Sequence, residues 1–267
     1  MRISSLAVLA AVVAVPVSAP EITDAVPGHP GVTYASLLKA AVPGLTKDKD
    51  GNWTASAEMR GFDGKTTGTD LAFNSIEALT VKEHGRNRLI LLTGDSQTGD
   101  SFSAVLAAYD DTARRPKLLD VMDAGGDRFV GFSEPRTLAI ALDTDAFIVN
   151  VNHFNSNQNY TDETIYYLDG GKLKVALANF TLNEGACGYE MRQVPVYKVR
   201  EDKGARFNAI AVSVTQTTTL NGEECDAGTK LPKAGSVTYT DIFRFDAKKN
   251  DYVAQSDTLS KLVKPDQ

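Results

Sequence analysis

Runs in which apolar and polar residues alternate follow one another along most of the chain from residue 75 onward. Twelve such runs are rich in β-branched and aromatic residues and are separated by turn residues, which predicts twelve β-strands. The runs form three sets of four, near residues 75–123, 137–183 and 194–257. In every set an Asp follows the third strand and a polar turn leads into the fourth; these residues are Asp110, Asp169 and Asp246.

The repeat predicts an all-β fold made of four-stranded antiparallel meanders. Repeats of this length with four strands each are typical of propeller blades, so the pattern favours a propeller-like arrangement. A twisted β-sandwich built from the same meanders is the alternative. Three sets are too few to close a ring, and a hairpin predicted at residues 53–59 and 65–73 would supply part of a fourth.

One short helix is predicted ahead of the strands. Leu37, Leu38, Ala41 and Val42 recur at helical spacing, and the Pro43-Gly44 pair would end the helix. The helix and the strands together predict a single β-rich domain over residues 33–267.

The N-terminus has the layout of a secretory signal peptide over residues 1–19. Arg2 precedes an apolar stretch of about a dozen residues that ends in small residues, which is too short to span a bilayer. The sequence therefore predicts a secreted or periplasmic protein. Residues 20–32 are rich in Pro and Gly, and they predict a flexible lead-in to the domain.

Composition and charge exclude several classes of partner. The chain has 267 residues, of which 42% are hydrophobic and 23% charged, as in ordinary globular proteins. Its net charge is −6 and its Lys and Arg residues form no basic stripe, which argues against nucleic acid as a partner. No second segment is apolar enough to span a membrane. The motifs of phosphate-binding loops, zinc proteases and serine esterases are also absent from the sequence.

Two cysteines, Cys187 and Cys225, predict one disulfide in an exported chain. In the chain-entropy model a bond that closes a loop of this length stabilises the fold by about 4 kcal/mol. Metal binding is not predicted from the cysteines, because the three histidines (His29, His84 and His153) show no ligand spacing relative to them.

The connections between strands place polar loops at one end of the predicted sheets. In a meander, successive connections alternate between the two ends, so the links at 93–101, 155–163 and 218–230 share an end with the links between sets. Both cysteines fall at this end, as a disulfide requires. Five of the fourteen residues in the stretch NVNHFNSNQNYTDE (150–163) are Asn. The candidate ligand-binding residues are His153, Asn155, Asn157, Tyr160 and Asp162, with Asp95 and Asp100 from the neighbouring set.

Loops on a rigid scaffold often carry binding sites, so the first hypothesis is an exported protein that binds a small molecule, a saccharide or a protein through this end. The competing interpretation is an ordinary loop, since Asn, Asp and Gly are also the residues that tight turns need. A second hypothesis is a hydrolase that uses loop carboxylates such as Asp95 and Glu163 with His153. A third is a structural envelope protein.

No cofactor is predicted, and calcium is the one ion for which a pattern exists. The stretch DKDGNW (48–53) has the central glycine of a calcium loop, but Thr46 and Ala57 stand where the first and last ligands belong. A hairpin turn is therefore the preferred interpretation of this stretch.

Overall fold

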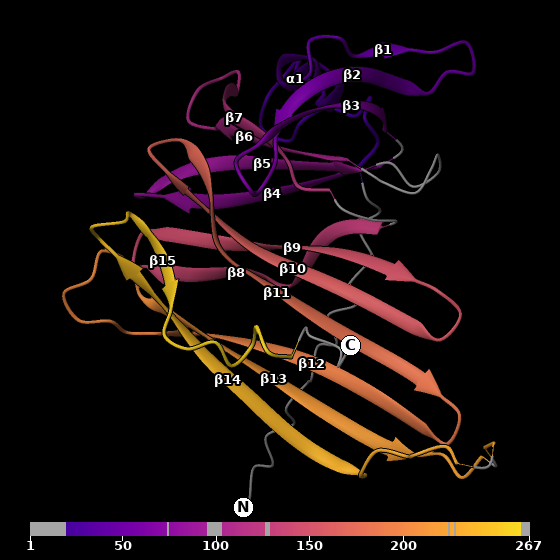
Figure 1. Ribbon diagram of the computed structural model, residues 1–267. Helices are drawn as coiled ribbons and strands as arrows, with labels where there is room; N and C mark the ends of the chain where they lie inside the picture. The colour runs from indigo at the N-terminus through magenta and orange to yellow at the C-terminus, as the bar shows by residue number, and fades with distance from the viewer. Residues whose placement is uncertain are drawn as a thin grey trace, which may run out of the picture.

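The computed structural model describes residues 20–73, 75–94, 103–125, 129–223, 225–226 and 228–262. These residues form one helix and fifteen strands, and all the strand pairs are antiparallel (Figure 1). The predicted all-β class is confirmed; the predicted signal peptide lies outside the described residues. The elements are α1 (Tyr34–Ala41), β1 (Thr46–Lys47), β2 (Trp53–Arg60), β3 (Thr66–Phe73), β4 (Ser75–Glu83), β5 (Arg86–Gly94), β6 (Ala104–Asp110), β7 (Lys117–Asp123), β8 (Phe129–Ala141), β9 (Thr144–Phe154), β10 (Gln158–Asp169), β11 (Lys172–Ala186), β12 (Tyr189–Arg200), β13 (Ala209–Leu220), β14 (Gly235–Asp246) and β15 (Asp251–Ala254).

The strands form three sheets in which neighbours in sequence are neighbours in space. Strands β1–β3 make one sheet, β4–β7 a second, and β8–β15 a third. Within the third sheet, β11 and β12 pair only where residues 184–186 meet 189–191. Beyond that joint the two strands diverge, so the eight-stranded sheet divides into one meander of β8–β11 and another of β12–β15.

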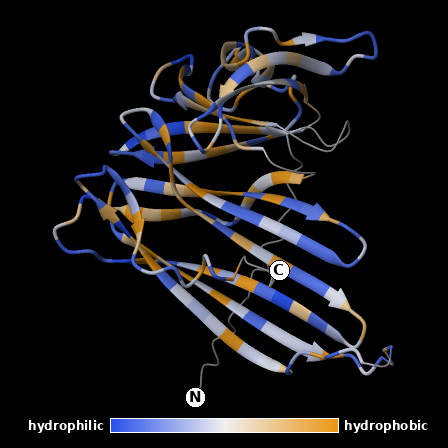
Figure 2. Cartoon of the chain, in the orientation of Figure 1, coloured by the Kyte–Doolittle hydropathy of each residue, from blue (hydrophilic) through white to orange (hydrophobic). Residues whose placement is uncertain are grey.

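The molecule therefore has four layers, β1–β3, β4–β7, β8–β11 and β12–β15. They stack face to face with a hydrophobic core in each of the three gaps (Figure 1). The first core joins α1, β2 and β3 to one face of β4–β7, the second joins the other face to β8–β11, and the third lies between β8–β11 and β12–β15. Successive side chains of an inner strand point to opposite faces and so pack against the layers on both sides. On β5, for example, Leu91 faces the first core and Ile90 the second. Hydrophobic residues accordingly concentrate where the layers stack, while the far ends of β9–β11 are largely hydrophilic (Figure 2).

The layers form an open stack. Sheet β1–β3 lies at one end and strands β12–β14 at the other (Figure 1), and among the described residues no strand pairs the first sheet with the last. The arrangement fits the sandwich alternative, and the closed ring of a propeller is not confirmed.

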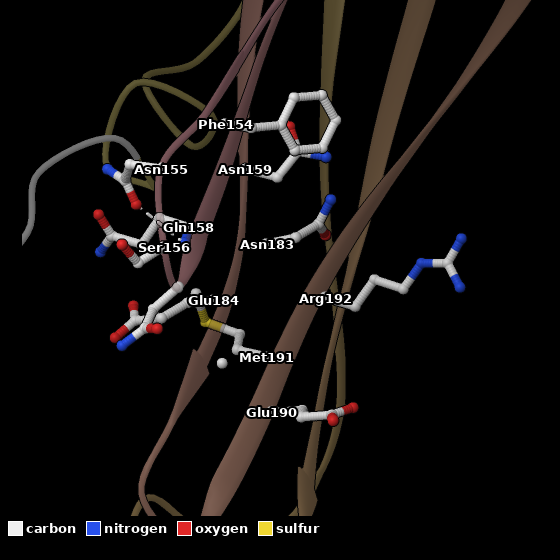
Figure 3. Close-up of a pocket in the computed structure, with 12 residues that line it drawn as sticks. Phe154, Asn155, Ser156, Gln158, Asn159, Asn183, Glu184, Glu190, Met191 and Arg192 are labelled. Carbon is white, nitrogen blue, oxygen red and sulfur yellow. Dashed lines mark hydrogen bonds between the residues drawn. The ribbon is translucent and has the colours of Figure 1, made fainter.

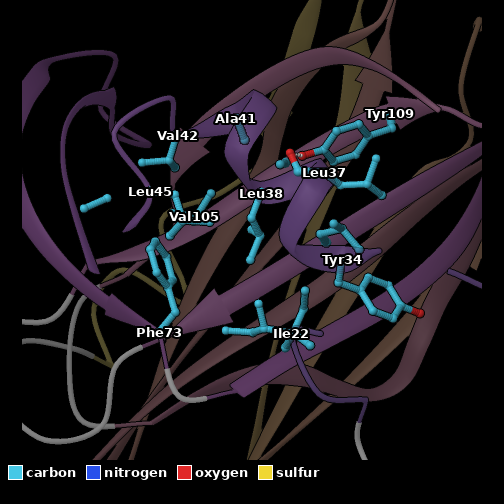
Figure 4. Close-up of a cluster of buried hydrophobic side chains, with 14 of the residues drawn as sticks. Ile22, Tyr34, Leu37, Leu38, Ala41, Val42, Leu45, Phe73, Val105 and Tyr109 are labelled. Carbon is cyan, nitrogen blue, oxygen red and sulfur yellow. Dashed lines mark hydrogen bonds between the residues drawn. The ribbon is translucent and has the colours of Figure 1, made fainter. Parts of the chain in front are cut away.

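The helix α1 begins and ends where the sequence indicates. The side chain of Thr33 accepts a hydrogen bond from the backbone N–H of Ser36, and the Ser36 side chain binds back to Thr33, which is a capping box. Leu37 and Leu38 are buried in the first core, and the chain leaves the helix at Val42, just before the Pro-Gly pair (Figure 4). This one helix among the described residues is too short to cross a bilayer.

Residues 20–32, for which the sequence predicts a flexible lead-in, lie against the first core. Ile22, Val26 and Val32 are each at most 5% exposed. The ring nitrogen Nε2 of His29 lies 2.5 Å from Asp111 Oδ1, which attaches the segment to the β6–β7 turn. The Pro and Gly residues therefore shape a tight path, and the three apolar side chains between them supply the burial that holds it.

A buried ion-pair network of the sheet β4–β7 lies at the end opposite the long loops, and a hydrogen bond links it to the next layer. Arg88 donates to Glu83 at 2.7 Å and to Asp110 at 2.6 Å, and the backbone N–H of Gly171 donates to Glu83 at 2.6 Å. This network connects β4–β7 to the β10–β11 turn. Of the repeated Asp residues, Asp110 pairs with Arg88 within the sheet β4–β7, whereas Asp169 accepts from Arg206 across the next gap, at 2.5 and 3.2 Å.

Candidate functional site

The β9–β10, β11–β12 and β13–β14 connections lie at the same end of the stack. The predicted disulfide joins two of them, with 5.7 Å between the Cα atoms of Cys187 and Cys225. Gly188 makes this joint possible: its φ is +84°, and a Cβ there would meet Cys225 Sγ at 2.9 Å and Leu231 Cδ2 at 2.6 Å. The sequence prediction of which connections share an end is consistent with this bond.

A shallow pocket of about 600 Å³ opens on this end, between the β9–β10 turn and the β11–β12 hairpin (Figure 3). Side chains with amide groups dominate its wall, together with one exposed aromatic ring and a few charged groups. The lining residues are Phe154, Asn155, Ser156, Asn157, Gln158, Asn159, Asn183, Glu184, Gly185, Glu190, Met191 and Arg192.

Strand register sets the centre of the pocket. Asn159 on β10 is paired directly with Phe154 on β9 and with Asn183 on β11, so the three side chains form one row across three strands. The row lies on the same face of β10 as Ile165 of the third core, at the end that extends beyond that core. Figure 3 shows the two carboxamides beside each other with the Phe154 ring next to them.

Hydrogen bonds fix one of these amides and leave the other partly unsatisfied. Asn183 Oδ1 accepts from the backbone N–H of Gln193 at 2.9 Å, which leaves its NH₂ group directed away from that contact. Asn159 Oδ1 is buried and has no hydrogen-bond partner among the described residues. A ligand hydroxyl or a water that reached this oxygen would satisfy an acceptor that is otherwise costly to bury.

The two asparagines of the β9–β10 turn have different roles: one closes the turn and the other has an exposed side chain. The backbone N–H of Asn155 donates to Gln158 O at 3.0 Å, and Asn155 Oδ1 accepts from Gln158 N at 3.1 Å. Asn157 uses its backbone, since its carbonyl accepts from Gly185 N at 2.8 Å, and its side chain is exposed. Asn155 thus closes the turn with its side chain, as the loop interpretation requires, whereas Asn157 presents an amide to the pocket.

The other predicted residues that the structure describes are not brought to this pocket. His153 and Tyr160 pair with each other across β9 and β10, on the opposite face of the sheet from Asn159, with ring centroids 6.0 Å apart. Asp162 shares the face of Tyr160 by alternation. Asp95 and Asp100 lie outside the described residues. Of the seven predicted residues, the structure therefore gathers Asn155 and Asn157 at the pocket.

Glu163 is the second carboxylate named for the hydrolase hypothesis. It lies in the third gap, between β8–β11 and β12–β15. It is 6% exposed; Oε1 accepts from the Ser133 hydroxyl, and Oε2 accepts from the Tyr197 hydroxyl at 2.6 Å. Burial, and then the neighbouring Glu163, raise the pKa of Tyr197. Glu163 is enclosed and His153 faces away from the pocket, so these two groups of the hydrolase hypothesis are not brought together there.

Charge at the pocket rim is mixed. Glu190 and Arg192 are exposed, and Glu184 accepts a hydrogen bond from the Tyr189 hydroxyl at 3.1 Å. Burial, and then Glu184, raise the pKa of that hydroxyl. The two carboxylates and one guanidinium stand around a centre of uncharged amides, which suits a ligand rich in hydroxyl groups better than an ion.

No metal site accompanies these groups in the part of the chain that the structure describes, where no three His, Cys, Asp or Glu side chains gather as metal ligands. The calcium-like stretch forms the β1–β2 turn. Asp48 Oδ1 accepts from the backbone N–H groups of Asp50 and Asn52 at 2.8 and 2.9 Å, so its carboxylate serves the turn.

Ten of the twelve lining residues are absent from the predicted site: Phe154, Ser156, Gln158, Asn159, Asn183, Glu184, Gly185, Glu190, Met191 and Arg192. The last six lie in one stretch, 183–192. The sequence prediction treated most of this stretch as a link between two sets, because Gly185 and Gly188 interrupt it. The period-two pattern of residues 179–183, in which polar residues alternate with Phe180 and Leu182, signals that β11 continues.

Comparison with known proteins gives no relative from which a role for these residues could be transferred: no family model, no curated protein and no solved structure matches the chain.

Proposed function

We propose that this protein is a saccharide-binding protein that holds an uncharged sugar unit in the pocket at the tips of β9–β12. The observation that carries the proposal is the row of Phe154, Asn159 and Asn183 across three paired strands. A carboxamide offers both donors and an acceptor, which matches adjacent sugar hydroxyls that also donate and accept. The exposed ring, at 51% exposure, supplies an apolar surface for the C–H face of a sugar ring.

Rigid strands position the central groups, which reduces the entropy lost on binding. Asn159 and Asn183 stand on paired β-strands, and Asn157 is held by the hydrogen bond of its carbonyl to Gly185. The pocket is shallow, so a single sugar unit buries little surface. We therefore expect dissociation constants of about 10 μM to 1 mM, as for weak binding at small interfaces.

The test is titration of the oxidised protein with a panel of neutral oligosaccharides, followed by calorimetry or by ligand-observed NMR. We expect Asn157→Ala and Phe154→Ala each to weaken binding about tenfold, because each removes one exposed pocket group without touching a core. The matched control is Asn87→Ala. Asn87 is an exposed asparagine near the start of β5, at the end of the stack opposite the pocket, and its replacement should leave binding unchanged. If no neutral saccharide binds, or if both pocket variants bind as wild type does, the proposal is rejected.

A further inference from the structure

The outward face of the last meander carries a regular ladder of hydroxyl groups. Three cross-strand pairs join β13 to β14, with oxygen–oxygen distances of 2.9, 3.0 and 2.9 Å. The pairs are Ser213 with Thr240, Thr215 with Thr238, and Thr217 with Ser236. Successive rungs are two residues apart along each strand, which corresponds to about 7 Å. In each pair one hydroxyl can donate to the other, so each rung keeps one O–H to offer to a ligand.

Three cations stand beside this ladder on the neighbouring strand β12. Arg192 is level with Thr217, while Lys198 and Arg200 lie farther along β12 on the same face. All three are exposed, and none has an ion pair among the described residues. Between Arg192 and Arg200 the outward side chains of β12 include no acid, although the whole chain has a net charge of −6. We call the ladder together with these three cations the hydroxyl face.

We propose that the hydroxyl face binds an acidic polysaccharide, with its carboxylate or sulfate groups on the three cations and its hydroxyls on the Ser/Thr ladder. Charge complementarity selects an anionic partner, and the even spacing of the rungs suits a polymer with a regular repeat. From Arg192 to Lys198 the strand rises about 20 Å, which spans several sugar units. The inference goes beyond the proposed pocket. The two sites share one residue, Arg192, which also lines the pocket, so the variants below leave Arg192 unchanged.

The composition of the face argues against other partners. Nucleic acid strands are held by aromatic stacking as well as by charge, but the aromatic residues of β12–β14, such as Tyr197, Tyr239 and Phe243, pack against the third core. Insertion into a lipid surface needs large apolar groups, and the outward apolar residues beside the ladder on β12 are Val194 and Val196. A second copy meeting this chain through the same face would bring like charges together.

The experiment measures binding of the oxidised protein to polygalacturonate, with dextran as the neutral polymer and a single-stranded oligonucleotide as the other polyanion. Lys198→Gln/Arg200→Gln removes two cations, and Thr215→Val/Thr238→Val removes one rung with little change in shape. The control Lys248→Gln/Lys249→Gln removes two exposed cations from the β14–β15 turn, so net charge changes equally. Circular dichroism and urea unfolding establish that each variant is folded.

We expect polygalacturonate to bind in a salt-sensitive manner, both face variants to lose at least about tenfold in affinity, and the control to change by less than about twofold. An equal loss in the control would mean that only net charge matters, and would overturn the proposal. So would absence of polygalacturonate binding, equal binding of dextran or the oligonucleotide, or salt-sensitive self-association through this face. Beyond residues 189–191 the other edge of β12 has no paired strand among the described residues, and cations on such an edge also hinder aggregation. If that is their sole role, the face variants lose solubility and not affinity, and the proposal is overturned. Neutral oligosaccharide binding that survives in both face variants would leave the pocket proposal intact.

Discussion

The buried tyrosines predict that the protein unfolds sharply in alkaline solution. Burial raises the pKa values of Tyr109, Tyr166, Tyr167, Tyr197 and Tyr252 well above the ordinary value near 10, and for Tyr197 the Glu163 carboxyl adds to the effect. These hydroxyls must remain protonated while they are buried between the layers. Unfolding releases them to water, where their pKa returns to about 10.

The sign and size of the effect follow from proton linkage. Because the folded-state pKa values are raised, the stabilisation is fully present below about pH 10 and is lost as the pH rises above it toward the folded-state values. One pH unit above the unfolded pKa, each tyrosine lowers the free energy of unfolding by about 1.4 kcal/mol. The five together remove about 5 to 7 kcal/mol near pH 11, which is comparable to the whole stability of an average domain.

The assay is urea unfolding followed by circular dichroism from about pH 8 to pH 11 at constant ionic strength, with tyrosinate absorbance recorded in parallel. We expect the unfolding midpoint to fall steeply above about pH 10, and the absorbance of the buried tyrosines to appear only together with unfolding. Gradual and complete ionisation of all tyrosines near pH 10, with the circular dichroism still native, would refute the reasoning. Tyr167→Phe is the internal check, because the Tyr167 hydroxyl is buried without a hydrogen-bond partner in the described part of the chain. This variant should be as stable as wild type or slightly more so at neutral pH, and should lose less stability at high pH.

Three further changes test the interlayer packing by urea unfolding at neutral pH. Arg88→Met leaves its buried carboxylate partner unpaired and should cost about 3 to 5 kcal/mol. Gly94→Ala places a Cβ 2.2 Å from Val130 Cγ1, across the second gap, and should cost about 1 to 3 kcal/mol. Replacing both Cys187 and Cys225 by Ser should lower the free energy of unfolding by about 2 to 4 kcal/mol.

Each of these changes has a control on the same scaffold. Arg86→Met removes an exposed arginine two residues before Arg88, and a cost above about 1 kcal/mol there would contradict the assignment of the stability to the buried network. Gly68→Ala adds a Cβ whose nearest neighbour is a side-chain carbon at 4.0 Å, so it should be nearly neutral. For the cysteine variant, the control is wild-type protein treated with reductant, which should match it in stability.

The fold class could be predicted because each strand carries its own pattern. The run Leu89–Leu92, for example, is apolar on both faces because layers cover it on both sides, and a buried strand with turn residues around it has few alternatives. The path of residues 20–32 was harder to predict, since Pro and Gly mark turns equally well in flexible and in packed segments. What decides between them is the burial of Ile22, Val26 and Val32, which depends on a surface formed by distant residues.

The candidate site could be predicted only in part, because the sequence does not give the register of the strands. Sequence proximity placed His153, Asn155, Asn157 and Tyr160 near one another, and they are indeed on one hairpin. Which face each side chain occupies depends on how β9 and β10 pair, and a shift of one residue would reverse every assignment. Asn183 joins Asn159 only because β10 and β11 pair over their whole length, through an irregularity after Ile165.

The open stack has a mechanical consequence. Each layer contacts its neighbours, so the molecule resembles a short one-dimensional array in which the last layer can detach while the first three stay folded. The Cys187–Cys225 bond spans the joint where that layer would separate. When β12–β15 separates, the bond keeps the β13–β14 connection beside the β11–β12 turn, so the return of the layer is an intramolecular event at high effective concentration. In an environment without chaperones that use ATP, such a tether would turn partial unfolding into a reversible excursion rather than a step toward aggregation.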